Sequence, residues 1–328
     1  MKSLDQVIKM ERNLLVTGAT GAIGRNLVPL LREKHGMDKV LVGYHSRIPQ
    51  GSLADGPTVQ VDVANKDELY NIVVKQKVSS IYHLAALLSV AAEQDPEAAE
   101  RVNTQGLRNV LDVMAEQVAN GNSMTGFWAS SIAVYGEGLP AENVAEEVVL
   151  KPFTVYGKGK VIGEQAIARF YKTKGVDMRV IRFPGLNGPG KPGLGTTEYA
   201  IEMIQAAAKG NHYTVPLKQD TIMPMMDMRD AVRAIMQLIA ASAGTVEVGK
   251  PYNIAAFSFS PQELAKVVKE FNPSFTVDYK PDELKQRIAD SWPNTINDSR
   301  ARNQWGWKSI ISLKEMVRNI YEAAKSEQ

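Results

Sequence analysis

The stretch that decides the fold is Leu14-Leu-Val-Thr-Gly-Ala-Thr-Gly-Ala-Ile-Gly24, a short apolar run that ends in a glycine-rich loop. Residues 22–34 follow with apolar side chains at helical spacing, which predicts a strand, a tight turn and a helix. Gly18 allows the turn, Gly21 lets a pyrophosphate approach the backbone, and Gly24 lets the helix pack closely on the sheet. The start of that helix offers unpaired N–H groups and a positive dipole end. This stretch therefore predicts a dinucleotide-binding turn.

The rest of the first half alternates short apolar runs with helical patterns. Strands that alternate with helices indicate a parallel sheet, because parallel strands need crossover connections. We therefore expect an α/β fold, a doubly wound parallel sheet of the Rossmann type. The expected strands are residues 40–42, 59–61, 81–84, 127–128 and 178–181, and the expected helices are residues 66–75, 97–116 and 155–174.

The character of the chain changes at Pro184, where a loop rich in glycine and proline runs to Gly195. The sequence after this loop is less regular, which indicates a second unit. We predict a dinucleotide-binding domain at residues 1–183, to which residues 227–256 return. A smaller C-terminal lobe for the substrate is predicted at residues 184–226 and 257–328.

Composition argues against several classes of protein. The chain has 328 residues with 38 Lys plus Arg, 36 Asp plus Glu and a net charge of +2. Without a long basic run, nucleic acid and membrane surfaces are poor candidate partners. The sequence has no cysteine, and its 4 histidines lie far apart, so we predict no metal site.

No apolar stretch reaches the ~20 residues that a membrane helix needs. The residues before Leu14 mix basic with acidic side chains, unlike an acid-poor transit peptide. We expect a soluble intracellular protein, in the mitochondrial matrix if the source is eukaryotic and in the cytoplasm otherwise.

A second group of residues, Ser130-Ser131, Tyr156 and Lys160, has the composition of a hydride-transfer site. Oxidation of a secondary alcohol needs a base for the hydroxyl proton, and a tyrosine can serve only if its pKa falls well below ~10. Lys160, one helical turn away, supplies a positive charge for this purpose. Ser131 is favoured over Ser130 as the partner of the reacting oxygen, because side chains alternate along a strand. The predicted catalytic residues are Tyr156, Lys160 and Ser131.

The end of the second expected strand, Gly43-Tyr-His-Ser-Arg47, leaves the choice between NAD and NADP open. Many such folds place an acid ~20 residues after the glycine loop to hold the ribose 2′-hydroxyl of NAD. Here His45 and Arg47 are suited to the 2′-phosphate of NADP instead. Asp62, after the third strand, is placed to meet the adenine edge, and Leu84-Ala-Ala86 is small enough to pass close to the pyrophosphate.

At this point the residues resemble the extended short-chain dehydrogenases over nearly the whole chain. In that family Asn103 braces the region of the active-site helix, and Pro184-Gly185 lies beside the nicotinamide. The motifs that carry the resemblance are Thr17-Gly-Ala-Thr-Gly-Ala-Ile-Gly24, His83-Leu-Ala-Ala86, Val102-Asn-Thr-Gln-Gly106, Ser130-Ser-Ile-Ala-Val-Tyr-Gly136, Tyr156-x-x-x-Lys160 and Arg182-Phe-Pro-Gly185. With the resemblance, the expected cofactor residues are Gly18, Thr20, Gly21, Ala22, Ile23, Gly24, His45, Arg47, Asp62, Val63, Leu84, Ala85, Ala86, Asn103, Tyr156, Lys160 and Phe183.

Within that family, the second lobe is most similar to the short-chain L-threonine 3-dehydrogenases. The likeness is carried by Gly195-Thr-Thr-Glu-Tyr-Ala200, Met223-Pro-Met-Met226, Ser291-Trp-Pro293, Asp298-Ser-Arg-Ala-Arg302 and Trp305-Gly-Trp307. It implies oxidation of L-threonine by NAD to 2-amino-3-oxobutyrate, in threonine catabolism toward glycine and acetyl-CoA. It also implies a homodimer through the helices at residues 97–116 and 155–174. The expected substrate residues are Ser89, Ser131, Tyr156, Gly185, Thr197 and Trp292.

Two alternatives remain from the sequence. The first is a sugar-nucleotide epimerase or reductase of the same fold. Such enzymes tend to place Arg-Asp-Phe, whose arginine grips a diphosphate, where this chain has Met223-Pro-Met225. The second is a regulatory protein that binds NAD(P) without catalysis, since a fold does not dictate a function. The resemblance favours NAD, whereas the missing acid after the second strand leaves NADP open.

Overall fold

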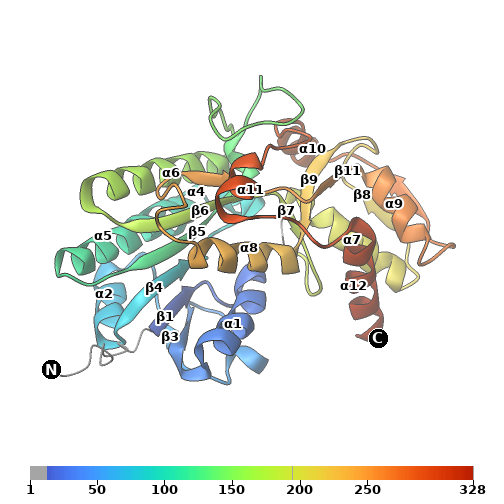
Figure 1. The fold of residues 1–328 in the computed structure, drawn as a ribbon. Coiled ribbons are helices and arrows are strands. Elements are labelled where there is room, and N and C mark those ends of the chain that lie inside the picture. The colour runs from blue at the N-terminus through green and yellow to red at the C-terminus, as the bar shows by residue number, and fades with distance from the viewer. Residues whose placement is uncertain (1–12, 194, 328) are drawn as a thin grey trace.

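A parallel seven-stranded sheet forms the centre of the protein in a computed structural model that describes residues 13–193 and 195–327 (Figure 1). Its strands are β1 (Asn13–Thr17), β2 (Val40–Tyr44), β3 (Thr58–Gln60), β4 (Val78–His83), β5 (Thr125–Ser131), β6 (Asp177–Phe183) and β10 (Pro251–Asn253). The order is β10-β6-β5-β4-β1-β2-β3, and every neighbouring pair is parallel. This is the doubly wound order of dinucleotide-binding sheets. The predicted fold class is confirmed.

Helices cover both faces of the sheet, as the alternation of side chains along β1 requires. Leu14 and Val16 pack in one core with α1 (Ala22–His35) and α8 (Met228–Ala240). Leu15 packs in the opposite core, whose helices are α2 (Lys66–Lys75), α5 (Gly106–Ala119) and α6 (Val155–Lys174). Figure 1 shows the resulting three layers. The run of three apolar residues in β1 is therefore the signature of a strand buried on both sides.

The expected helix at residues 97–116 is interrupted by a wide turn. After α3 (Ser89–Gln94), the chain forms α4 (Pro96–Ala99) and then a π-helical segment at Glu100–Gln105 before α5 begins. Asn103, inside this segment, pairs with both backbone groups of Leu87: its Oδ1 accepts from the N–H at 2.8 Å and its Nδ2 donates to the carbonyl at 3.0 Å. Such π turns often occur at functional sites. Here the irregular turn anchors the loop that follows β4.

A smaller lobe lies beside the carboxyl edge of the sheet (Figure 1). Its apolar core is separate and holds Met203, Ile204, Leu264 and Ile320, all fully buried. Its elements are β7 (Gly185–Asn187), α7 (Tyr199–Ala208), β8 (Tyr213–Val215), β9 (Met223–Asp227), β11 (Phe257–Phe259), α9 (Pro261–Lys269), β12 (Val277–Tyr279), α10 (Glu283–Asp290) and α12 (Leu313–Ser326).

The chain crosses back to the sheet after the first part of this lobe. β10 adds to the sheet beside β6, and α8 packs on the face that α1 also covers. Ala301, in α11 (Ser299–Trp305), and Trp307 belong to that same core, although we assigned residues 257–328 to the second lobe. The division at residues 183 and 184 stays a prediction. The segment of mixed charge before Leu14 lies almost wholly outside the described residues.

Gly163 of α6 packs against β5 at a point where no side chain fits. An added Cβ would lie 2.5 Å from Cη2 of Trp128 and 2.9 Å from Cδ2 of Leu107. We expect Gly163→Ala to lower the free energy of unfolding by about 1–3 kcal/mol, because overpacking forces neighbours to shift.

Gly159→Ala, one turn earlier, is the matched control for urea unfolding. Its added Cβ would meet only Thr104 Oγ1, at 3.8 Å. An alanine there should raise the free energy of unfolding by about 0.5–1 kcal/mol, because glycine loses more backbone entropy in a helix. Equal effects of the two substitutions would contradict the close packing of α6 on β5.

Candidate active site

A cavity of about 690 Å³ lies at the carboxyl edge of the sheet. Its lining comes from the loop after β1, the end of β4, the end of β5, α6 and the segment after Pro184. β1 and β4 are the neighbours at which the strand order reverses. Ligands of doubly wound sheets bind in the crevice at this reversal point. The position of the cavity is therefore that of a dinucleotide site.

The glycine loop and the end of β4 touch through their backbones. Gly18 has a φ of +66°, and an added Cβ would lie 2.5 Å from the backbone nitrogen of Ala85. The start of α1 has Gly21 as N-cap, no side-chain cap and no acid in its first turn. Gly21 and Ala22 line the cavity, so the N–H groups of this helix end are available to an anion. These features fit a pyrophosphate.

The serine, tyrosine and lysine of the predicted catalytic group all line this cavity. The Ser131 side chain lies close enough to Tyr156 to lower the pKa of its phenol. Lys160 Nζ donates to the carbonyl of Ala129 at 2.6 Å and lies 4.4 Å from the centroid of the Trp128 ring. The start of α6 is held by Thr154, whose Oγ1 accepts from the N–H of Gly157 at 3.0 Å. The structure thus brings the three groups together.

The two adjacent serines have different environments. Ser130 is buried and also lines the cavity, but its hydroxyl donates to Glu164 Oε1 at 2.6 Å and is therefore engaged with a buried carboxylate. Ser131 ends β5, where its Oγ accepts from the N–H of Ala133 at 3.1 Å, and its side chain lies close to Tyr156. This difference supports Ser131 over Ser130 as the group that meets a substrate.

Burial governs the charge of the catalytic pair in the protein on its own. Desolvation raises the pKa of Tyr156 to about 12, and the nearby Ser131 side chain offsets this only in part. Desolvation also lowers the pKa of Lys160 to about 7, while the nearby charge of Glu164 raises it. We expected Lys160 and an oxidised nicotinamide together to lower the pKa of Tyr156; in the protein on its own, burial is the dominant influence on this phenol. The phenol therefore needs a further positive charge beside it before it can act as a base near neutrality.

A buried ion pair lies directly behind the catalytic group. Arg182, at the end of β6, donates from Nε to Glu164 Oε1 at 2.8 Å and from Nη2 to Oε2 at 2.7 Å. The two side chains are 3% and 7% exposed. Because Glu164 also accepts from Ser130, this pair joins β5, β6 and α6. It fixes the strand that ends in Ser131 against the helix that carries Tyr156 and Lys160.

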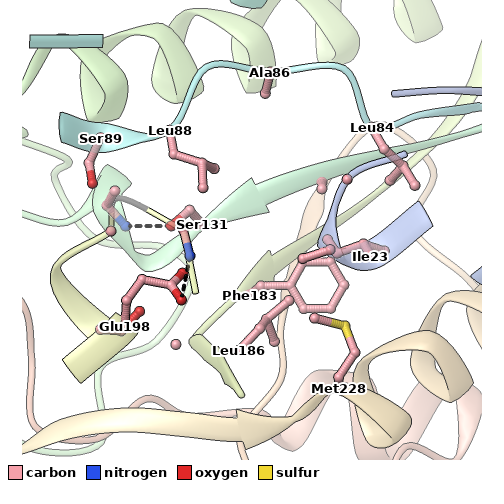
Figure 2. A pocket seen from close by; sticks show the side chains of 18 of the residues that line it. Ile23, Leu84, Ala86, Leu88, Ser89, Ser131, Phe183, Leu186, Glu198 and Met228 are labelled. Carbon is pink, nitrogen blue, oxygen red and sulfur yellow. Dashed lines mark hydrogen bonds between the residues drawn. The ribbon is translucent and has the colours of Figure 1, made fainter. Parts of the chain in front are cut away.

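The two ends of the cavity differ in polarity. Figure 2 shows Ser89, Ser131 and Glu198 at one end and apolar side chains, among them Phe183 and Met228, at the other. Our sequence reasoning missed Glu198, which is half-buried and accepts from the N–H of Gly193 at 3.0 Å. Burial raises the pKa of Glu198 above its usual value. The signal was present in the Gly195-Thr-Thr-Glu stretch, where a carboxylate follows Thr197.

The predicted site residues divide into those that line the cavity and those that lie around it. Lining the cavity are Gly21, Ala22, Ile23, Arg47, Leu84, Ala85, Ala86, Ser89, Ser131, Tyr156, Lys160, Phe183, Gly185, Thr197 and Trp292. Outside the lining are Gly18, Thr20, Gly24, His45, Asp62, Val63 and Asn103. Their roles stay predictions. Asp62 pairs with Arg101 at 3.3 Å and accepts from the N–H of Ala64 at 2.9 Å, so its carboxylate already has partners.

The described residues lack two further kinds of feature. Residues 13–193 and 195–327 hold no group of three or more His, Cys, Asp or Glu side chains suited to a metal ion. Within the same described residues, every helix is too short or too polar to cross a bilayer.

Comparison with known proteins identifies the family. The model described as the NAD dependent epimerase/dehydratase family matches residues 14–255. The chain belongs to this family, that of the extended short-chain dehydrogenases. A relative called an uncharacterised epimerase/dehydratase, from Staphylococcus aureus (strain USA300), is 37% identical over 319 residues, covering 96% of this chain and 98% of the relative.

Among solved structures, the chain is similar to L-threonine dehydrogenases. That of Clostridium difficile is 35% identical with a TM-score of 0.91, covering 96% of this chain and 98% of the other. A monomeric L-threonine 3-dehydrogenase from a metagenome database is 37% identical with a TM-score of 0.90, covering 96% and 99%. The resemblance predicted from the motifs is confirmed at the level of the family and of these structural neighbours.

The buried pair of Glu164 and Arg182 makes a stability prediction. We expect Glu164→Gln to lower the free energy of unfolding by about 3–5 kcal/mol, because it leaves a buried guanidinium without its counter-charge. Glu116→Gln is the control, since Glu116 pairs with Lys66 at 2.6 Å but both side chains are more than a third exposed, at 44% and 41%. That exposed pair should contribute at most about 1 kcal/mol. If urea unfolding showed a similar loss of unfolding free energy for Glu164→Gln and Glu116→Gln, the structural role of the buried pair would be contradicted.

Proposed function

We propose that the protein oxidises L-threonine to 2-amino-3-oxobutyrate, with NAD as the hydride acceptor. The observation that carries the proposal is the convergence of Ser131, Tyr156 and Lys160 on a cavity that has an open helix start beside it and a small polar end. The likeness to L-threonine dehydrogenases supports the choice of substrate. We place the reaction in threonine catabolism toward glycine and acetyl-CoA.

The chain's own residues handle the proton and the reacting oxygen. NAD, when bound, supplies the hydride acceptor and a positive charge next to the phenol. Tyr156 then takes the proton of the threonine β-hydroxyl, and Ser131 donates a hydrogen bond that holds the same oxygen. Lys160, whose Nζ donates to the carbonyl of Ala129, would hold the nicotinamide ribose with its remaining donors. The overall reaction converts L-threonine and NAD to 2-amino-3-oxobutyrate, NADH and a proton.

The polar end of the cavity suits the charged groups of a small amino acid. Glu198 provides a carboxylate for the ammonium, and the hydroxyls of Ser89 and Thr197 are suited to the carboxylate. Thr197 lies close to the backbone of Gly185, where an added Cβ would be 2.9 Å from the threonine Cβ. Trp292, which reaches the cavity from the second lobe, would cover the substrate.

The apolar stretch in β9 favours a small substrate over a nucleotide sugar. Met223 and Met225 are fully buried in the second core and offer no cation to a diphosphate. We therefore prefer a dehydrogenase to an epimerase. The intact Ser131, Tyr156 and Lys160 group argues against a regulatory protein without catalysis.

We also propose a homodimer through α5 and α6. These helices lie side by side on one face of the sheet (Figure 1). Ile162 on α6 is 47% exposed and would be covered by such a contact. One structural neighbour is described as monomeric. Light scattering should give the mass of two chains for this protein, and the mass of one chain would contradict the proposed dimer.

The direct test of the reaction is formation of NADH with L-threonine. Tyr156→Phe should lower kcat by about 100-fold or more, because it removes the base, while NAD binding is retained. Tyr171→Phe is the matched control, since Tyr171 is 45% exposed on the same helix and does not line the cavity. Near-normal oxidation by Tyr156→Phe would remove this residue from the mechanism.

The choice of substrate needs its own comparison. L-threonine, its stereoisomers and a nucleotide sugar should be assayed side by side. We expect activity with L-threonine alone, and Glu198→Gln should raise the KM for L-threonine while leaving the Kd of NAD unchanged. Conversion of the nucleotide sugar without threonine oxidation would overturn the proposed function in favour of an epimerase.

A further inference from the structure

The end of β2 lies directly beside the glycine loop. The N–H of Ala19 donates to the carbonyl of Gly43 at 3.2 Å, and Thr17 pairs with Gly43 in the parallel ladder. The residues that follow β2 therefore leave the sheet next to the glycine loop, which is the proposed pyrophosphate site. In doubly wound sheets this strand end meets the ribose of the adenosine.

The side chains at this strand end are neutral or basic. The chain reads Tyr44-His-Ser-Arg47, without the carboxylate that would accept a bond from the ribose 2′-hydroxyl and repel a phosphate there. The backbone is well held, because the Tyr44 carbonyl accepts from the N–H of Val61 at 2.8 Å and the His45 carbonyl accepts from Gln60 Nε2 at 3.1 Å. This end of β2 thus presents fixed backbone and no negative side chain.

Arg47 is the cation that this strand end offers to a ligand. It is exposed and lines the same cavity as Gly21 and Ala22. Among residues 13–193 and 195–327, no ion pair or side-chain hydrogen bond occupies its guanidinium. The acid at the end of the neighbouring strand, Asp62, is paired with Arg101 at 3.3 Å, which offsets its charge. A guanidinium with free donors matches a phosphate through two parallel hydrogen bonds.

We propose that the end of β2 is a subsite for a phosphate on the adenosine ribose, with Arg47 as its ligand, so that the protein binds NADP(H) as well as NAD(H). The inference rests on the proposed dinucleotide site and extends it, because the proposed function names NAD alone. It is independent of the identity of the oxidised substrate.

Binding of two nucleotide fragments tests the subsite without any turnover. Adenosine 2′,5′-bisphosphate and 5′-AMP differ only in the 2′-phosphate, and their Kd values can be compared by isothermal titration calorimetry. We expect the bisphosphate to bind about tenfold more tightly or better, as a charge-assisted contact implies. The gain should shrink as ionic strength rises, because an exposed arginine is screened by salt.

Substitution of Arg47 assigns the gain to its source. Arg47→Ala should abolish the preference for the bisphosphate and leave the Kd of 5′-AMP unchanged. Arg169→Ala, which removes an exposed arginine of α6 outside the cavity, is the control and should preserve the preference. Tyr44→Asp should instead raise the Kd of the bisphosphate by about tenfold or more, because it places an acid at the strand end that repels the 2′-phosphate.

Two outcomes would overturn the inference: equal Kd values for the two nucleotides in the unsubstituted protein, or an unchanged preference in Arg47→Ala. Failure of the proposed function would show in the oxidation assay and not in the binding of the two nucleotides. A protein that prefers the bisphosphate through Arg47 but oxidises no L-threonine would keep this subsite and lose only the substrate assignment.

Discussion

The burial of the Lys160 ammonium is the constraint on which the rest of the site depends. This side chain is 3% exposed, and its partners are the carbonyl of Ala129 and the ring of Trp128. A buried amine tends to lose its proton, and the charge of Glu164 works against that loss. Glu164 in turn is held by Arg182 and Ser130. The contacts that hold Glu164 in place therefore help to keep the Lys160 side chain protonated beside the cavity.

This arrangement explains why the fold and the chemistry belong together. The parallel sheet brings the ends of β1, β4, β5 and β6 to one edge. The glycine loop after β1 and the loop after β4 approach so closely that Gly18 has no room for a side chain. The long helix α6 then crosses behind β5 and carries Tyr156 and Lys160 to the same edge. The position of the cavity and of the open helix start follows from the strand order, whereas the Tyr156 and Lys160 pair comes from the sequence of α6.

Much of this could be predicted from the sequence, and the remainder could not for identifiable reasons. Local patterns in a sequence indicate turns, buried strands and helix faces. The patterns of this kind are the glycine spacing, apolar runs such as Leu14 to Val16, and the spacing of Tyr156 and Lys160. The pairing of Glu164 with Arg182 joins residues of different elements, so no local pattern reveals it. The π-helical turn around Asn103 is favoured by its contacts with Leu87, which lie outside the helix. Glu198 was missed because an acid in a short 3₁₀ turn, here Thr196–Glu198, carries no signal of its own until a cavity forms beside it.

The most direct test of the central claim is a spectroscopic titration of Tyr156 with and without NAD. The difference in tyrosinate absorbance between the unsubstituted protein and Tyr156→Phe isolates this phenol. Burial raises its pKa to about 12 in the protein alone, so the account predicts no ionisation below about pH 10 without NAD. With saturating NAD, the added positive charge should lower the pKa so that the phenol ionises within about one to two units of neutrality. The same titration curve under both conditions would contradict the account, because Tyr156 would then not be the base that the cofactor activates.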